Sequence, residues 1–466
     1  MLVEELARLF TAPNPEYLTA SKYSPWGSIS ADIPPTISFH WTDEDGAMCI
    51  PRGVSPRMLS KKAMKEFYSY EFEDQRTSAK IDFPKPLLTP NEEQAALLDN
   101  VKFTRKQNLR PFGNYLVLAS TATGKTILQA LIARYFRQRT MVICPTDLVV
   151  IAWQNDLAKL FGFAPEDIGL IKQSVWRIGA HFTIASAKTL SKRRERWDEL
   201  DKTFGTLVVD EAQNIAAPYL FNYVSQASFK YLVGATATES SSGRPNSHLR
   251  AVLGEPVGKQ DAYHAETATS MPISAVTTLH TNFRYTYQSD NLDWHDFALA
   301  MASDAERNEQ IVAAAKKDWL EGRSVLVTTR NLEHVNVLKC MLKEAGVENV
   351  NEISGRTNSS KKHTRKLMDA IIARKTRCQV GTVSAVKEGA NVPVWDCLHI
   401  TMPIAAPGNL EQLLGRIRRK AEGKKTAVVT YYLDIKVPYA LGILKRTVIP
   451  VFRQMKIPGY QNLFIA

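Results

Sequence analysis

Residues 119–126 constrain the fold more than any other part of this sequence. They read Ala-Ser-Thr-Ala-Thr-Gly-Lys-Thr, with an apolar run before them at 115–119 and an amphipathic run after them. A strand, a glycine-containing loop and a helix in this order expose successive backbone N–H groups at a helix N-terminus, which is an arrangement that binds phosphate. The sequence therefore predicts an α/β domain with a parallel sheet that binds a nucleoside triphosphate.

The chemistry of a triphosphate gives roles to the residues of this loop. The ammonium group of Lys125 can neutralise the β- and γ-phosphates, and the Thr126 hydroxyl can hold Mg²⁺. We expect the whole segment to form the ATP site, with these residues: Ala119, Ser120, Thr121, Ala122, Thr123, Gly124, Lys125 and Thr126.

Two adjacent carboxylates follow the apolar run at 206–209. At the carboxyl end of a parallel strand beside the phosphate loop, Asp210 can hold Mg²⁺, through a water molecule. Glu211 can then orient and deprotonate the attacking water. Asp210 and Glu211 are thus predicted to complete a hydrolytic site.

A third segment, Gln412-Leu-Leu-Gly-Arg-Ile-Arg-Arg419, lies too far along the chain to belong to the same domain. It is predicted to be helical, with Arg416 and Arg419 three residues apart on one face. If they face a γ-phosphate across a cleft, such arginines stabilise the charge of the transition state. We therefore take Gln412, Arg416 and Arg419 as candidate catalytic residues, although the pattern alone is typical of a basic surface helix.

Alternating apolar and amphipathic runs predict two α/β lobes, at residues 88–265 and 266–466, after a small accessory domain at 1–87 that ends in a proline-rich linker. A helix is expected to start at Thr89-Pro-Asn-Glu92, and another at Ser303-x-x-Glu306. Residues 188–200 and 408–421 are expected to be helices, and 239–275 a loop. Strands are predicted at 115–119, 140–144, 181–186, 206–210 and 231–235, and then at 324–329, 350–353, 378–382, 397–402 and 426–433.

The charge balance indicates a polyanionic partner. The 466 residues carry a net charge of +12, and nucleic acid is a common reason for so large an excess. Eight Lys and Arg residues between Arg356 and Arg377 are expected to face phosphate, as is a basic stretch that begins at Arg52. The five cysteines lack metal-binding spacing, and neither a signal peptide nor a membrane span is evident, so we expect reduced thiols in a cytoplasmic protein.

With these segments in hand, the chain resembles the superfamily-two helicases, the DEAD/DEAH-like two-lobed motors, from about residue 88 to the end. The resemblance implies two RecA-like lobes and contacts to a nucleic-acid strand from Pro145 and Thr146, Ser186, and Thr382. It further implies that Thr236 and Thr238 couple hydrolysis to strand movement, that Gly389 contacts the nucleotide, and that Gln94 or Glu92 reads adenine.

Within that superfamily the chain looks most like the branch-migration DNA helicases of large tailed bacteriophages, partly through Ile50-Pro-Arg-Gly53. The resemblance implies ATP and Mg²⁺ as cofactors, branched DNA as the partner, and a monomer that acts in the host cytoplasm in replication, recombination or repair. Three alternatives remain open: an RNA helicase, an ATP-dependent duplex clamp, and a nuclease-linked motor, for which Asp434-Ile-Lys436 is half of a signature.

Overall fold

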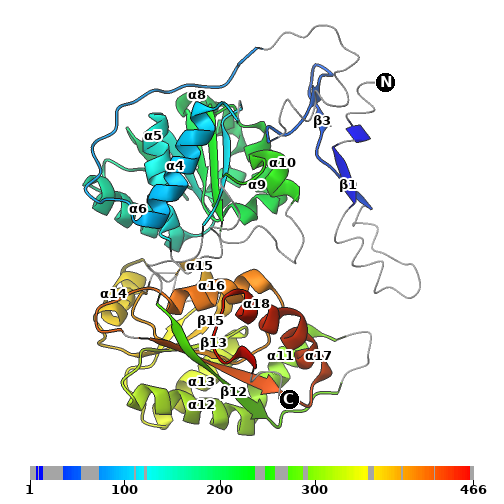
Figure 1. Ribbon diagram of the computed structural model, residues 1–466, viewed down its shortest axis with the longest axis vertical. Coiled ribbons are helices and arrows are strands. Elements are labelled where there is room, and N and C mark those ends of the chain that lie inside the picture. The colour runs from blue at the N-terminus through cyan, green and yellow to red at the C-terminus, as the bar shows by residue number, and fades with distance from the viewer. Residues whose placement is uncertain are drawn as a thin grey trace.

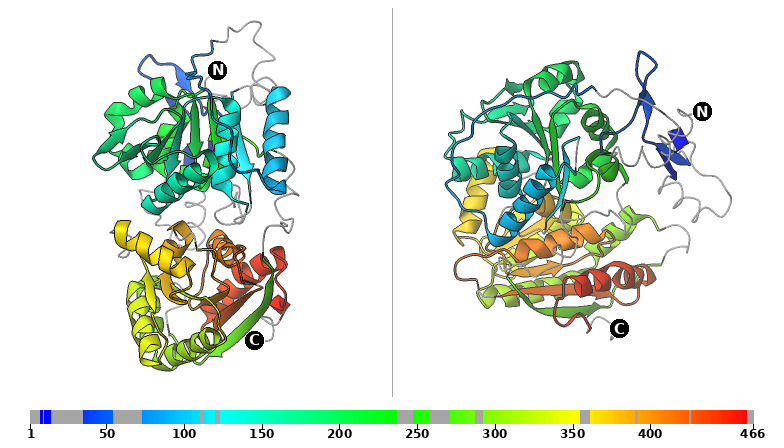
Figure 2. Two further views of the ribbon diagram at one scale, coloured as in Figure 1. Left: turned by 90° about the vertical axis from the view of Figure 1, so that its left-hand side faces the viewer. Right: turned by 45° about the horizontal axis from the view of Figure 1, so that its top comes forward.

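The computed structural model shows two α/β lobes stacked one on the other, with the N-terminal segments beside lobe one (Figures 1 and 2). This confirms the predicted fold class. No helix in the described ranges is long and apolar enough to cross a bilayer. The structure describes these residues: 7–8, 10–13, 35–53, 73–109, 112–119, 123–236, 247–257, 271–286, 292–354, 361–389, 392–424 and 426–461.

Lobe one is built on a seven-stranded sheet whose order is β5-β11-β10-β6-β9-β7-β8. All neighbours pair in parallel except β7 and β8, which form an antiparallel edge. The parallel strands end at the same edge, where the phosphate loop and the acid pair are expected. The strands are β5 (Asn114–Leu118), β6 (Thr140–Cys144), β7 (Gly169–Lys172), β8 (Val175–Arg177), β9 (Phe182–Ser186), β10 (Thr206–Val209) and β11 (Tyr231–Thr236).

Two sets of helices cover the two faces of this sheet, each over its own apolar core. One set consists of α4 (Glu92–Lys106), α5 (Lys125–Phe136) and α6 (Asp147–Phe161). The other set consists of α7 (Ala187–Ser191), α8 (Trp197–Thr203), α9 (Pro218–Gln226) and α10 (Ser247–Leu253), with short 3-10 turns at η2 (Arg194–Arg196) and η3 (Ala212–Ala216).

Lobe two has a six-stranded, all-parallel sheet of order β12-β17-β16-β13-β15-β14. Its strands are β12 (Ile273–Thr281), β13 (Val325–Thr329), β14 (Asn351–Ile353), β15 (Cys378–Thr382), β16 (Cys397–Ile400) and β17 (Ala427–Asp434). Its helices are α11 (Trp294–Ser303), α12 (Ala305–Leu320), α13 (Leu332–Glu344), α14 (Lys361–Ile372), α15 (Val383–Gly389), α16 (Pro407–Ile417), α17 (Pro438–Ile443), the π-helical η6 (Leu444–Val448) and α18 (Ile449–Gln454).

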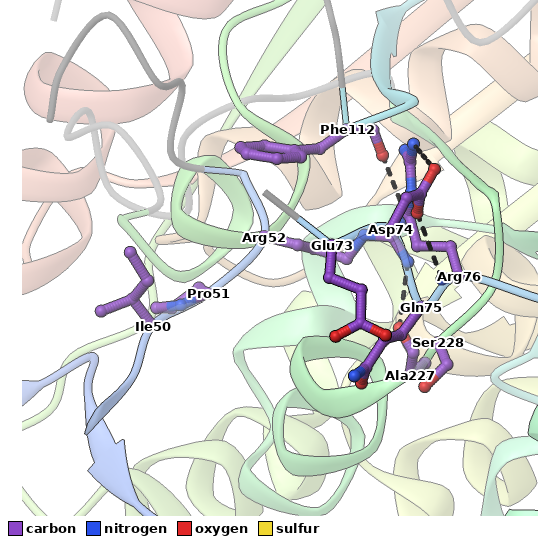
Figure 3. Close-up of a pocket in the computed structure, with 10 residues that line it drawn as sticks. All are labelled: Ile50, Pro51, Arg52, Glu73, Asp74, Gln75, Arg76, Phe112, Ala227 and Ser228. Carbon is purple, nitrogen blue, oxygen red and sulfur yellow. Dashed lines mark hydrogen bonds and ion pairs between the residues drawn. The ribbon is translucent and has the colours of Figure 1, made fainter. Parts of the chain in front are cut away.

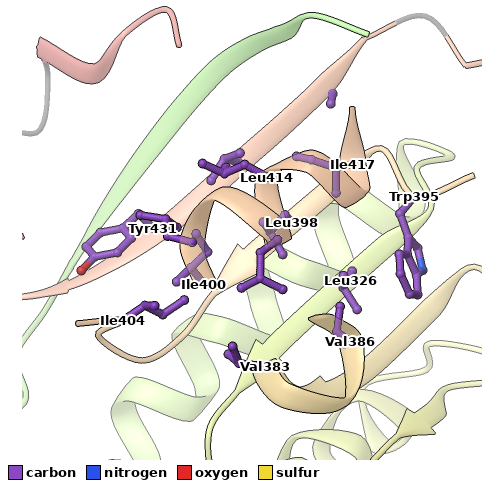
Figure 4. Packing of buried hydrophobic residues seen from close by; sticks show 14 of the residues in the cluster. Leu326, Val383, Val386, Trp395, Leu398, Ile400, Ile404, Leu414, Ile417 and Tyr431 are labelled. Carbon is purple, nitrogen blue, oxygen red and sulfur yellow. The ribbon is translucent and has the colours of Figure 1, made fainter. Parts of the chain in front are cut away.

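The core that supports α16 is the part of lobe two that matters most for the site. Figure 4 shows Leu414 and Ile417 of this helix packed towards Leu398 and Ile400 of β16. All four side chains are buried, and burying each contributes about 1.5–3 kcal/mol relative to exposure. The cleft-facing helix is therefore held rigidly on its sheet.

In the N-terminal region, β1 (Thr11–Pro13) pairs with β2 (Thr36–Ser38), and β3 (Trp41–Thr42) pairs with β4 (Met48–Cys49). The segment predicted to be a linker lies against lobe one, where Phe83 packs on its core. The Leu87 N–H donates to the Leu160 carbonyl. The domain limits drawn from the sequence remain a prediction.

Several local predictions were wrong, for identifiable reasons. Helix α4 starts after Asn91, whose side chain accepts from the Gln94 N–H while its own N–H donates to the Gln94 amide, so the capping box sits two residues later than expected. Asp304 caps α12 in place of Ser303. The expected helix at 188–200 is broken into three pieces, and the expected loop at 239–275 contains α10 and the start of β12.

A buried ion pair joins helix α12 to strand β17 in lobe two. Arg307 Nε donates to Asp434 Oδ1 over 2.8 Å with both side chains fully buried, and the Thr281 hydroxyl donates to the same oxygen. We expect Asp434→Asn to lower the free energy of unfolding by about 3–5 kcal/mol, because Arg307 would keep a buried charge without its counter-ion.

Urea denaturation checks this, with Glu255→Gln as the control, since Glu255 pairs with Arg250 on the surface and should lose at most about 1 kcal/mol. Equal losses from the two substitutions would contradict the prediction. The same geometry takes the support of Asp434-Ile-Lys436 away from the nuclease-linked alternative, because Asp434 is fully buried and paired with Arg307.

Candidate nucleotide and nucleic-acid sites

The start of α4 supports the phosphate loop through hydrogen bonds. The Thr123 hydroxyl donates to Glu93 Oε1 over 2.5 Å, and the Gln94 amide donates to the carbonyls of Thr123 and Gly124. Gly124 has a φ of +76°, and a Cβ there would lie 2.8 Å from Gln94 Nε2, so only glycine fits. Ser120, Thr121 and Ala122 lie outside the described residues, and Ala119 is buried at the end of β5.

The hydrogen bonds of Gln94 help to decide whether Gln94 or Glu92 is placed to contact adenine. Gln94 is buried, and its amide is already engaged by the loop carbonyls and by the Asn91 N–H. Glu92 is exposed on the first turn of α4. Gln94 therefore supports the phosphate loop in this structure, and a contact from Gln94 to adenine remains a prediction.

Lys125 and the acid pair lie together at the ends of α5 and β10. Lys125 Nζ is 4.0 Å from Glu211 Oε1. Asp210 accepts the Trp153 indole N–H over 2.8 Å and the Glu211 backbone N–H over 2.9 Å. Burial, together with the nearby Glu211 charge, raises the pKa of Asp210 to about 6. The pKa of Glu211 is lowered. Burial acts to raise it, but the charge of Lys125 and a hydrogen bond from Gln213 have the larger, opposite effect.

Gln213 links the acid pair to β11. Its amide nitrogen donates to Glu211 Oε2 over 3.0 Å, and its amide oxygen accepts the Thr236 hydroxyl over 2.6 Å. Glu211 itself has a φ of +48°, a left-handed backbone conformation that is uncommon for residues other than glycine. Gln213 thus connects Thr236 to Glu211 through two hydrogen bonds, whereas Thr238 lies outside the described residues.

The arginines of lobe two approach these acids across the cleft, and Figure 1 shows α15 and α16 on the side of lobe two that faces lobe one. An Arg416 Nη donates to the Lys387 carbonyl. Burial lowers the pKa of Arg416, while the negative charges of Glu211 and Asp210 act to raise it. Gln412 is buried on the same helix, and Gly389 ends α15.

Arg419 does not lie on the helix as expected, because α16 ends at Ile417 and Arg418 caps it. Its side chain nevertheless lies near enough to Arg416, Asp156 and Glu211 for their charges to act on it. Burial and the charge of Arg416 lower its pKa well below the usual value, and Asp156 and Glu211 act in the opposite direction. Both predicted arginines are thus brought to the acid pair, although by different local structures.

The predicted strand contacts of lobe one surround one cavity of about 400 Å³. Pro145 and Thr146 follow β6 and Ser186 ends β9, so these three residues meet at the strand ends. The wall also carries four cationic side chains, Lys172, Lys188, Lys192 and Arg193. We call this cavity the basic pocket. Thr382 ends β15 in lobe two, 3.4 Å from the Ser384 hydroxyl, and is not part of it. Arg356 lies outside the described residues.

Several arginines predicted to face phosphate have other partners. Arg377 packs on the Trp319 ring and donates to its carbonyl, and Arg374 donates to the Glu422 carbonyl. Arg52 is inserted into lobe one, where it donates to Asn114, Phe112 and Ala227, as Figure 3 shows in part. Burial lowers its pKa to about 9. Arg52 therefore anchors the N-terminal region on lobe one and was wrongly expected to face nucleic acid.

Comparison with known proteins supports the resemblance to the superfamily-two helicases. Residues 87–241, which are most of lobe one, match the family model described as the res subunit of type III restriction enzymes. The probable helicase D10 of Escherichia phage T5 is 26% identical over 374 residues, which cover 80% of this chain and 76% of that protein. These matches support the superfamily-two helicases as the family of this chain. The chain is accordingly an ATP-hydrolysing enzyme that acts on nucleic acid.

Two solved structures show how widely the fold of this helicase is shared. The Saccharomyces cerevisiae protein Dbp5, bound to RNA and ADP BeF3, has a TM-score of 0.56 at 14% identity and covers 79% of this chain and 88% of its own. The restriction-modification enzyme LlaBIII, bound to DNA, has a TM-score of 0.55 at 15% identity and covers 80% of this chain and 30% of its own. At these identities the likeness extends to the fold alone.

Sequence reasoning missed four residues around the site: Glu93, Trp153, Asp156 and Lys387. Glu93 stands directly beside Gln94, and this position next to a predicted site residue could have identified it. Lys387 stands two residues before Gly389 on α15, whereas Trp153 and Asp156 lie on the amphipathic helix α6, between the recognised segments. Nothing in the local pattern of such a helix indicates which polar residue faces a site and which faces solvent.

Proposed function

We propose that this helicase is an ATP-dependent DNA translocase that remodels forks and four-way junctions by branch migration. The observation that carries the proposal is the basic pocket, in which the hydroxyls of Thr146 and Ser186 stand beside lysines. Such groups hold a phosphodiester backbone without reading bases, as a moving motor requires. The pocket opens at the sheet edge that also carries the acid pair, so strand and nucleotide would share one rigid support.

The cycle we propose follows from the two positions of the arginines. With ATP bound, Arg416 and Arg419 would contact the γ-phosphate and hold the lobes together, and loss of that phosphate would release them. The separation between Thr146 on lobe one and Thr382 on lobe two would then change once per turnover. Repeated changes of this kind move a strand through the cleft.

The residues present also fit a Mg²⁺ ion. Thr126 and Asp210 supply hard oxygen ligands of the kind that Mg²⁺ prefers. Asp210 is buried beside the carboxylate of Glu211, and a cation would offset the negative charge of this pair. A bound ion would neutralise phosphate charge during transfer. Lys125 would contribute to the same neutralisation, while Glu211 would hold the attacking water and accept its proton.

We expect a three-way fork and a four-way junction to stimulate ATP hydrolysis more than single-stranded DNA or RNA of equal length at the same salt concentration. The fork should also lose a strand in an ATP-dependent manner in a gel assay. Lys125→Ala should abolish both effects and serves as the control for contaminating enzymes.

Other outcomes identify the alternatives. Stronger stimulation by RNA, with RNA strands displaced, would contradict the proposal and support an RNA helicase. Stimulation by duplex or branched DNA without any strand displacement would contradict it in favour of an ATP-dependent clamp.

A further inference from the structure

Helix α6 presents two side chains to the residues that are expected to hold Mg²⁺. Trp153 is fully buried, and its indole N–H donates to Asp210 Oδ2 over 2.8 Å. The Thr126 hydroxyl lies close enough to the Asp156 carboxylate to act on its pKa as a hydrogen-bond donor would. Trp153 and Asp156 are three residues apart and therefore lie on one face of the helix. One helix face thus contacts both candidate ligands, Thr126 on α5 and Asp210 on β10.

These contacts orient oxygen atoms. With Oδ2 of Asp210 held by the indole and Oδ1 by the Glu211 N–H, the carboxylate plane is fixed without the ion. The hydroxyl of Thr126 has one proton, and donating it to Asp156 would direct the oxygen lone pairs away from that carboxylate. Fixing the orientation of ligands in advance is the usual work of groups just outside a metal's own ligands.

The same helix also meets lobe two. Helix α15 packs against α6, and the charges of Asp156 and Arg419 attract each other across the cleft. Asp156 therefore stands between the Thr126 hydroxyl and an arginine that is expected to contact the γ-phosphate. At the other end, Thr146 occupies the N-cap position of α6, and Asp147 pairs with Lys172 in the basic pocket.

We propose that Trp153 and Asp156 are positioning residues for the metal end of the nucleotide site, with Trp153 orienting Asp210 and Asp156 orienting Thr126. The inference rests on the proposed function in so far as Thr126 and Asp210 hold the ion. It goes beyond that function by giving α6, which contains none of the segments recognised in the sequence, a defined task in metal binding.

The test measures metal binding directly and needs no turnover. Mn²⁺ is titrated into the full-length protein in the presence of a non-hydrolysable ATP analogue, and free Mn²⁺ is followed by electron paramagnetic resonance. Trp153→Phe keeps an aromatic ring but removes the N–H, and we expect it to weaken Mn²⁺ binding by about 10-fold, at the lower end of the range for such groups. Asp156→Ala should have an effect of the same order.

A conservative variant separates positioning from simple support of the fold. Asp156→Asn keeps an oxygen that accepts from Thr126, so its Mn²⁺ affinity should stay close to that of the wild type. Asn155→Ala, on the exposed side of the same helix, is the matched control. All variants are also compared in thermal unfolding and in binding of the analogue with the metal chelated, which a positioning role leaves unchanged.

The outcomes distinguish this proposal from the one on which it rests. If Asp210→Asn leaves Mn²⁺ binding intact, the metal ligands themselves are wrong. If Asp210→Asn abolishes binding while Trp153→Phe and Asp156→Ala bind as the wild type does, the positioning role alone is overturned. Should Trp153→Phe fail to fold, the half-buried Asp156 carries the test, and equal losses in Asp156→Ala and Asp156→Asn would overturn it.

Discussion

Replacing Arg419 by alanine should lower the rate constant of nucleic-acid-stimulated ATP hydrolysis by about 10³-fold or more, the range in which a transition-state arginine acts. The physical reason is the placement of its guanidinium. The charges of Asp156 and Glu211 attract the guanidinium, and we expect the γ-phosphate to develop its transition-state charge beside these two carboxylates. Single-turnover hydrolysis with a saturating fork measures the effect.

Two further variants make that result specific. Arg419→Lys keeps a positive charge but loses the fork of N–H groups, so it should recover only part of the rate. Lys420→Ala changes the next side chain, which is exposed, and should hydrolyse ATP as the wild type does. A rate for Arg419→Ala within a few-fold of the wild type would show that this arginine does not contact the transferred phosphate.

The parts of the site that could be predicted from the sequence are those in which strand, loop and helix follow one another directly. The loop before Lys125 and the acids after β10 each lie at the end of an apolar run, so their position at the sheet edge follows from the parallel topology. Arg416 could be placed because the register of a helix fixes which residues share a face. In each case a few neighbouring residues carry the whole signal.

The remainder of the site depends on contacts between distant segments. Trp153 meets Asp210 across 57 residues, and Arg52 meets Ala227 across 175. Neither helix periodicity nor charge pattern specifies such pairs, because both describe which side of an element is apolar and leave its partners open. Arg52 is the clearest example of an error from this source. Its positive charge indicated nucleic acid, but its partners are the Asn114 amide and two backbone carbonyls.

Local boundaries failed for a related reason. The predicted start of α4 was based on Thr89 and Pro90, because these residue types favour helix starts in general. The reciprocal bonds between Asn91 and Gln94, reinforced by the bonds from Gln94 to the phosphate loop, favour a start two residues later. A tertiary contact thus decided between two acceptable caps, and it did so because the helix start is also a support for the nucleotide site.

Replacing Glu211 by glutamine should abolish hydrolysis while leaving ATP binding intact. Lys125 and the hydrogen bond from Gln213 lower the pKa of Glu211 against the effect of burial, so the carboxylate is ionised at neutral pH and can accept a proton from water. Glutamine has nearly the same shape and keeps an oxygen for the Gln213 contact, but it cannot accept that proton. Loss of a positioned base costs about 10²–10⁴-fold in rate.

The measurement pairs single-turnover hydrolysis with the affinity for a fluorescent ATP analogue, and Glu195→Gln, an exposed glutamate on η2, is the control. Because binding of ATP should persist, the Glu211→Gln protein should still hold a fork in the presence of ATP and release it more slowly than the wild type. If Glu211→Gln hydrolyses ATP within ten-fold of the wild-type rate, Glu211 is not the general base. Loss of ATP binding would instead show that Glu211 mainly holds Lys125 in place, since the two side chains lie 4.0 Å apart.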